Sequence, residues 1–288
     1  LQGGWSTGTW NFVYYINTFL ERMREAKGVS EETFAHYEGT ARFWRAWNYF
    51  ELVKTFGAVP WYDHVIRSDN QEDLYKPRDS REYVMDRVLE DLNYACEHCY
   101  SSSAWLNNQK INRYIALGIK SRICLFEGTY RKYHRVDPWD PEYNKDNKWL
   151  REAAKACEEL MEAGIYSLVS TPANVSTQYR SLFTSADVQK QEVMWAREYS
   201  AEKNVTHDVT WYFTSGSMGP GWSLDADFVY TYLNRDGSRF TDRSDYKSTT
   251  YAEQFQNRDY RLQQTVISPE YRKLVGGVSK LFAPDFSV

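Results

Sequence analysis

Seven tryptophan and tyrosine side chains fall in segments whose neighbours are polar and loop-like. A flat ring in such a position can stack on the apolar C–H face of a sugar, while amide, carboxylate and guanidinium groups pair with the hydroxyls. The chemistry that these residues predict is reversible carbohydrate binding, and packing into the core is the alternative for each single ring. The seven candidates are Trp5, Trp61, Tyr62, Trp105, Trp211, Tyr212 and Trp222.

Stacking alone predicts weak binding. If each ring contributes about 1–1.5 kcal/mol, two or three rings supply about 2–4.5 kcal/mol. That free energy corresponds to a dissociation constant in the millimolar range or weaker. Hydrogen bonds, or the repeated units of a polymer, must supply the rest, so the residues favour a weak, multivalent receptor.

The cysteines and histidines form no recognisable catalytic or metal-binding pattern. Cys96-Glu-His-Cys99 has the spacing of a zinc or redox pair, but no second pair follows at ligand spacing, and both cysteines continue an apolar helix face. No histidine lies in a nucleophile or zinc-protease motif. We therefore predict no catalytic residue, no metal site and no cofactor, which makes the chain a binding protein and not an enzyme.

Composition limits the other function classes. The formal net charge is −4, so the basic excess of a nucleic-acid-binding protein is missing, and we expect no nucleic-acid partner. The sequence has no run of about 18 apolar residues, so no membrane-spanning helix is predicted. Aromatic residues make up 17% of the chain, and core packing explains those in polar segments less well.

The first two thirds of the chain are predicted to be helices joined by short breaks. Apolar residues recur at helical spacing over about 9–27, 30–56, 80–99, 112–130 and 149–163. Ser30 opens the second helix and Gly57 ends it, while Asp79 opens the third as an Asp variant of the capping box. Helix pairs with short connections resemble tetratricopeptide hairpins, although no strict period of about 34 residues is visible.

The second of these helices is predicted to be central. Its polar residues recur every third position from Arg42 to Lys54, and the positions between them are mostly apolar or aromatic. So narrow a polar strip means that protein covers more than half of the helix circumference. We therefore expect Trp47 to be a core side chain.

The last third of the chain changes character. Residues 192–200 could form a short strand, residues 211–222 are rich in glycine, serine and aromatic side chains, and a helix is predicted only over 224–233. The expected fold class is mostly α, with tetratricopeptide-like helical hairpins and an irregular, loop-rich part carrying a few short strands.

Three segments resemble one family. Residues 41–60 follow the pattern Ala-Arg-Phe-x-Arg-Ala through Tyr-Phe-x-Leu to Gly-x-Val-Pro. Residues 77–80, Pro-Arg-Asp-Ser, precede Val-Leu-Glu-Asp-Leu at 88–92, and Asn-Arg-Asp-Tyr-Arg-Leu at 257–262 is similar to an Asp-Pro-Arg-Leu turn with Tyr260 in place of proline. In this order the segments resemble the SusD/RagB family over roughly 10–262.

The resemblance implies a place and partners for the protein. Members of that family are surface lipoproteins of Bacteroidetes that capture glycans or peptides for import. For this chain it implies a glycan ligand, a SusC-like TonB-dependent outer-membrane transporter as partner, and anchoring at the cell surface through an N-terminal lipid absent from this chain. It also implies one incomplete SusD-like domain over 1–288, with a helical core over 9–190 and a loop-rich, ligand-side region over 191–288, both ends being cuts through a larger domain.

Glycan capture is the leading interpretation, and three others stay open. A relative of the same family could capture peptides. An all-helical glycoside hydrolase would also be rich in tryptophan, and the two converging carboxylates that it needs cannot be seen in a sequence. A tetratricopeptide-type scaffold would bind protein partners.

Overall fold

The chain folds into two compact units. The computed structural model describes residues 4–106, 109–134, 147–170, 174–185, 187–200, 202–209, 212 and 223–282. Leu1–Ser167 with Met194–Ala196 form the first unit, which we call the helical unit. Leu168–Val193 with Arg197–Val288 form the second, which we call the C-terminal unit. The division of one domain at residue 190 stays a prediction.

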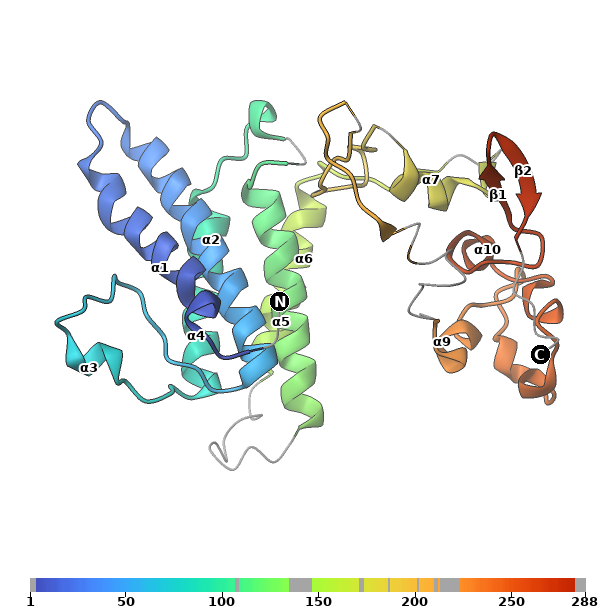
Figure 1. The fold of residues 1–288 in the computed structure, drawn as a ribbon, viewed down its shortest axis with the longest axis horizontal. Helices are drawn as coiled ribbons and strands as arrows, with labels where there is room; N and C mark the ends of the chain where they lie inside the picture. Colours follow the sequence, from blue (N-terminus) through green and yellow to red (C-terminus); the bar gives the residue numbers. More distant parts are fainter. Residues whose placement is uncertain are drawn as a thin grey trace. The chain divides into compact units, whose positions relative to one another are not determined.

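The helical unit is a succession of packed helices. In chain order these are α1 (Thr7–Arg22), α2 (Glu31–Phe56), α3 (Gln71–Leu74), α4 (Arg81–His98), α5 (Arg113–Tyr133) and α6 (Lys148–Glu162), with 3-10 turns η1 (Met23–Glu25) and η2 (Ser103–Trp105). Apart from the short α3, each helix packs on the helix before it, as Figure 1 shows. This arrangement confirms the predicted tetratricopeptide-like architecture. None of the described helices has a stretch long and apolar enough to cross a membrane.

The predicted helix boundaries hold where capping residues set them. Ser30 Oγ accepts the Thr33 amide, and Asn112 Oδ1 accepts the amides of Tyr114 and Ile115. The predicted Asp79 cap is wrong, because Ser80 caps α4. Asp79 instead accepts the Trp61 amide at 2.7 Å, so it fixes the loop before the helix.

Helix α2 is central, as predicted. Phe43, Tyr49 and Leu52 are buried in the hydrophobic core between α2, α4 and α5. Trp47 is only partly buried and makes an edge contact with Trp195, so it lies at the margin of the core and not within it.

The polar strip of α2 carries the charges that organise the unit. Arg45 is buried, and its Nε and Nη2 donate to Asp91 of α4 at 2.7 and 2.9 Å. Arg42 Nε donates to the same carboxylate at 2.8 Å. Arg45 also donates from Nη1 to Asn17 Oδ1 of α1 at 3.1 Å, so one guanidinium links three helices.

A second buried charge cluster joins α4 to α5. Glu127 is fully buried and accepts hydrogen bonds from Arg81 at 2.6 Å and from Arg131 at 2.9 Å. The Arg81 guanidinium also lies 3.8 Å from the centre of the Tyr130 ring. Both arginines are thus paired with a carboxylate and packed on apolar surface, which is the arrangement that makes a buried charge tolerable.

The expected strand over 192–200 is wrong. Within the described residues 187–200 the chain is irregular, and only Ser200 forms an isolated bridge, to Val205. Trp195 packs against Phe43 and Trp44 with ring centres 5.9 and 5.6 Å apart, so this segment completes the helical unit. A strand needs a neighbour for its backbone groups, whereas this segment is held by its side chains.

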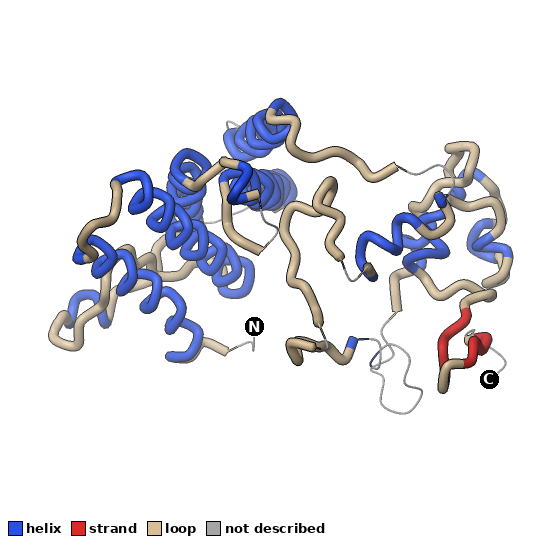
Figure 2. The backbone as a smooth tube through the Cα atoms, turned by 90° about the horizontal axis from the view of Figure 1, so that it is seen from above, coloured by secondary structure: helices blue, strands red, loops and turns tan. Residues whose placement is uncertain are grey.

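The C-terminal unit has short elements. These are α7 (Gln178–Thr184), α9 (Ala226–Tyr230), η4 (Phe240–Asp242), η5 (Tyr246–Ser248), η6 (Glu253–Phe255), α10 (Tyr260–Thr265), β1 (Arg272–Val275) and β2 (Val278–Leu281). The two strands form an antiparallel hairpin around Gly276 and Gly277, both with positive φ (Figure 2). The helix predicted over 224–233 is shorter, as α9, and the hairpin is an element that the sequence analysis missed.

Arg258 is the centre of this unit. It is 2% exposed, and its guanidinium donates to the carbonyls of Val229 at 3.1 Å and Tyr232 at 2.7 Å. The same group lies 3.8 Å from the centre of the Phe240 ring. The arginine of the 257–262 motif therefore satisfies carbonyl groups at the end of α9 and holds the turns around it.

Replacing Asp91 tests the buried ion pair. We expect Asp91→Ala to lower the free energy of unfolding by about 3–5 kcal/mol, because two guanidinium groups lose their carboxylate inside the protein. Urea denaturation measures this loss. Glu51→Ala is the control, since it removes only the surface pair with Lys54 and should cost about 0–1 kcal/mol. Equal effects of the two substitutions would contradict the role given to Asp91.

Candidate functional site

Trp61 and Tyr62 lie inside the helical unit. Trp61 is 4% exposed, its ring centre is 4.2 Å from that of Tyr49, and the Arg45 guanidinium lies 5.2 Å from it. Tyr62 is also buried. In this structure both rings pack into the core, which is the alternative to ligand contact stated above. Neither ring has a face open to a sugar.

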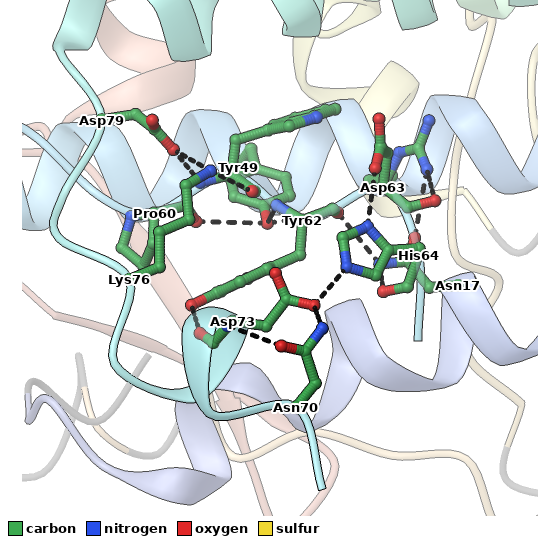
Figure 3. Close-up of polar contacts among 12 residues, drawn as sticks. Asn17, Tyr49, Pro60, Tyr62, Asp63, His64, Asn70, Asp73, Lys76 and Asp79 are labelled. Atoms are coloured by element: carbon green, nitrogen blue, oxygen red, sulfur yellow. Dashed lines mark hydrogen bonds and ion pairs between the residues drawn. The ribbon is translucent and has the colours of Figure 1, made fainter. Parts of the chain in front are cut away.

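The loop that carries these two residues is fixed by polar contacts, drawn in Figure 3. Tyr49 Oη accepts the Tyr62 amide at 2.7 Å. Asn17 Nδ2 donates to the carbonyls of Tyr62 and His64 at 2.9 and 3.0 Å. The Tyr62 hydroxyl donates to the Asp73 carbonyl at 2.8 Å, which connects the loop to α3. The loop is thus anchored by side chains of α1 and α2.

His64 connects two carboxylates across this loop. Its Nδ1 lies 2.9 Å from Asp63 Oδ1 and its Nε2 lies 2.7 Å from Asp73 Oδ2 (Figure 3). Hydrogen bonds with Asp63 and then Asp73 raise the pKa of His64 above its ordinary value. A neutral imidazole has one N–H, so only the imidazolium can donate to both carboxylates. The loop therefore favours protonated His64.

Two other candidates lie at opposite ends of α2. Trp5 is 45% exposed and makes an edge contact with Phe56, the ring centres being 5.2 Å apart. The Arg78 guanidinium lies 4.6 Å from the centre of the Trp5 ring. Trp105 is half-buried and packs against His36 at 4.5 Å. Positions 36 and 56 of one helix are about 30 Å apart, so the two tryptophans do not form one site.

The remaining three candidates belong to the C-terminal unit. Tyr212 is exposed. Trp211 and Trp222 lie outside the described residues. The structure therefore gives the position of the Tyr212 side chain alone, and ligand contact by the 211–222 segment stays a prediction.

The Cys96–Cys99 pair is part of the core. Both thiols are free and buried, and burial raises the pKa of Cys96 to about 12 and that of Cys99 to about 11. Cys99 Sγ lies 3.9 Å from the His36 carbonyl oxygen. Metal binding and thiol chemistry both need the thiolate, which this environment disfavours. The described residues contain no group of three side chains suited to hold a metal ion.

A cavity in the C-terminal unit brings several aromatic side chains together, which the loop candidates do not. It has a volume of about 540 Å³ and lies between α7, α10 and the start of β1. This volume is in the range of about 300–1,000 Å³ that small-ligand sites occupy. Its aromatic and aliphatic lining consists of Tyr179, Phe183, Tyr271, Val209, Val266 and Ile267.

The rings of this cavity are set by the two short helices. Tyr179 and Phe183 are one turn apart on α7 and make an edge contact at 5.3 Å. Phe183 is 73% exposed, so its ring is accessible from the cavity. Tyr271, immediately before β1, lines the cavity opposite the two rings of α7.

One glutamine fixes the distance between α7 and α10. Gln264 Oε1 accepts the Arg180 amide at 2.9 Å, and Gln264 Nε2 donates to the carbonyls of Val175 and Tyr260 at 3.1 and 2.9 Å. All three contacts are with backbone groups, so they position the helices whatever side chains line the cavity.

Sequence reasoning missed this cavity. The one local signal is the aromatic pair Tyr179 and Phe183 at helical spacing. Tyr271 is contributed from 91 positions beyond Arg180, and no local pattern joins the two.

A second cavity of about 500 Å³ is polar. It is lined by Asn234, Arg235, Asp236, Phe240, Arg243, Glu253, Gln256 and Asn257. Three of its charges are already engaged: Arg243 pairs with Asp245 at 2.6 Å, Asp236 accepts from Ser238, and Glu253 accepts from Thr250. With a single ring among its described lining residues, this cavity is less suited to stacking.

Comparison with known proteins identifies the family. A family model described as "Starch-binding associating with outer membrane" matches residues 4–125, and one described as "SusD family" matches residues 191–279. The second range includes the Arg258 motif, and the first includes α1, α2 and α4. The chain belongs to the SusD family.

Solved structures share the fold. A SusD-like protein from Bacteroides fragilis has a TM-score of 0.65 at 21% identity, over 92% of this chain and 49% of that one. A SusD-like carbohydrate binding protein from the same species has a TM-score of 0.67 at 20% identity, over 97% of this chain and 48% of that one.

A curated relative extends the comparison to sequence. A SusD-like protein of Formosa agariphila is 20% identical over 216 residues, which are 75% of this chain and 34% of that protein. The chain thus spans about a third of the length of this relative and about half of the length of the two solved ones.

The His64 contact predicts a pH-dependent loop. Because the pKa of His64 is raised in the folded protein, its contribution is present below the ordinary histidine pKa of about 6.5 and is lost as pH rises through the raised value. We expect amide exchange in 63–76 to be slower at about pH 5.5 than at about pH 8.5, after correction for intrinsic rates. His64→Gln should remove this difference and His98→Gln should keep it. A difference that persists in His64→Gln would assign it to another group.

Proposed function

We propose that this protein captures glycans at the cell surface and delivers them to a TonB-dependent outer-membrane transporter. The observation that carries the proposal is the cavity with Tyr179, Phe183 and Tyr271 in its lining, in a chain of the SusD family. Three rings around an open cavity suit the flat C–H faces of sugar rings. Nearby amide and hydroxyl groups suit the sugar hydroxyls.

The strength of such a site agrees with a receptor that must release its ligand. Three rings at about 1–1.5 kcal/mol each give about 3–4.5 kcal/mol, which alone corresponds to millimolar affinity or weaker. Repeated sugar units raise the effective affinity through rebinding, so a polymer would be held more firmly than a short oligosaccharide. Binding without turnover is the activity that we propose, and the protein is not assigned a catalytic role.

Further contacts are proposed for the exposed loop aromatics. Trp5, Trp105 and Tyr212 have accessible or half-buried rings, and Trp211 and Trp222 stay candidates from the sequence. We give Trp61 and Tyr62 a supporting role, because their buried rings hold the loop over α1 and α2.

The partner and the location are proposed from the family. The family model that matches residues 4–125 is described as associating with the outer membrane. We propose a SusC-like transporter as partner and an N-terminal lipid as anchor of the full protein. In the same protein, residues 9–190 would supply the helical core together with α7, which lines the ligand cavity, and residues 191–288 would supply the rest of the ligand side.

Glycan binding by the cavity can be tested with a panel of oligosaccharides and calorimetry. We expect Phe183→Ala and Tyr271→Ala each to weaken binding about fivefold to tenfold, the effect of losing one stacked ring. Phe228→Ala is the matched control, since Phe228 is an exposed ring of the same unit outside the cavity. Equal affinity in all three variants would remove the cavity from the proposal. Release of shortened sugars by the purified protein would show a hydrolase, and binding of peptides alone would show a peptide-capturing relative.

The 211–222 segment has its own test. We expect Trp211→Ala or Trp222→Ala to weaken glycan binding without lowering the melting temperature, because these rings are proposed to contact ligand and not the core. Calorimetry and thermal unfolding of the same samples measure both quantities. Unchanged affinity in both variants would exclude this segment from the site.

A further inference from the structure

The ring-lined cavity has an asymmetric charge. Among its described lining residues, Arg180 is the one charged side chain, and the others are aromatic, aliphatic, hydroxyl or amide groups. These described residues include no carboxylate to offset that guanidinium. The polar cavity differs, because Asp236 and Glu253 line it together with two arginines.

The side chain of Arg180 is directed by its neighbours. Its guanidinium carbon lies 5.3 Å from the centre of the Tyr271 ring, and Nη2 lies 3.5 Å from the Tyr271 hydroxyl. Its own amide is held by Gln264, so the start of α7 cannot shift freely. The guanidinium therefore lies at the aromatic wall of the cavity.

Arg180 also differs from neighbouring arginines in its partners. Arg243 pairs with Asp245 and Arg261 pairs with Asp259, each at 2.6 Å. Among the described residues, no carboxylate lies within ion-pair distance of Arg180. A guanidinium that is exposed, oriented and without a carboxylate can accept an anionic group from a ligand.

We propose that the cavity binds an anionic sugar residue, with the sugar ring stacked on the aromatic wall and its carboxylate or sulfate paired with Arg180. This inference rests on the proposed glycan-binding function and names the substrate class of the same site. The planar guanidinium donates two parallel hydrogen bonds to such a group, which fixes the orientation of the sugar as well as its charge.

The test compares pairs of ligands that share their sugar rings and differ in charge. An oligogalacturonide and its methyl ester have the same sugar rings, and esterification removes the carboxylate charges. A sulfated galacto-oligosaccharide and its desulfated form provide the second arm, which separates sulfate from carboxylate as the anionic source. Affinity of the purified chain for all four is measured by calorimetry at low and at raised salt.

We expect the wild-type protein to bind one of the two anionic ligands about twofold to fivefold more tightly than its uncharged form, the range for an ion pair at an exposed arginine. Raised salt should reduce this preference. Arg180→Gln should abolish it, and Arg180→Lys should retain part of it. Lys247→Gln removes one positive charge of the same unit outside the cavity and is the matched control.

The outcomes separate the inference from the function on which it rests. Equal binding of charged and uncharged forms by the wild-type protein, or a preference that survives Arg180→Gln, would overturn the anionic assignment alone. If Tyr271→Ala still weakens binding of the uncharged forms in that case, the glycan site stands. Failure of the wild-type protein to bind any of the four ligands or the wider glycan panel would overturn both. Because Arg180 is exposed, an unchanged melting temperature should accompany each of its variants.

Discussion

The helical unit depends on one carboxylate that is shared by two arginines. Asp91 lies inside the protein between Arg42 and Arg45, and Arg45 continues to Asn17. Burying a charge is unfavourable unless it is paired and hydrogen-bonded, so these side chains can lie only where all their partners are present. The contact therefore fixes the rotation of α2 against α1 and α4, and hydrophobic packing fills the space that it defines.

The family signature thus describes the framework of the protein. Arg42 and Arg45 belong to the first motif and Asp91 to the second, and they meet each other. Arg258 of the third motif holds backbone carbonyls inside the C-terminal unit. These paired charges cannot be exchanged singly, because each exchange leaves a buried partner uncompensated. This is why the sequence identifies the family more readily than the ligand.

Local signals predicted the helices well, and long-range contacts account for what they missed. Helical periodicity and the caps Ser30 and Asn112 are written within a few positions, so α2 and α5 follow from the sequence. The burial of Trp61 depends on Tyr49 and Arg45, which are distant in the sequence, and the polar neighbours of Trp61 in the loop do not predict it. The ring-lined cavity combines α7 with residues after α10, which periodicity cannot bring together.

Trp195 has a consequence for the order in which the protein can mature. It covers the aromatic edge of α2 at Phe43 and Trp44, although the chain between these residues supplies most of the helical unit and the start of the C-terminal unit. During synthesis from the N-terminus, α1 to α6 emerge first, and their apolar surface stays open until Met194–Ala196 leave the ribosome. The last aromatic contacts of the helical unit are therefore completed only after the first part of the C-terminal unit has been made.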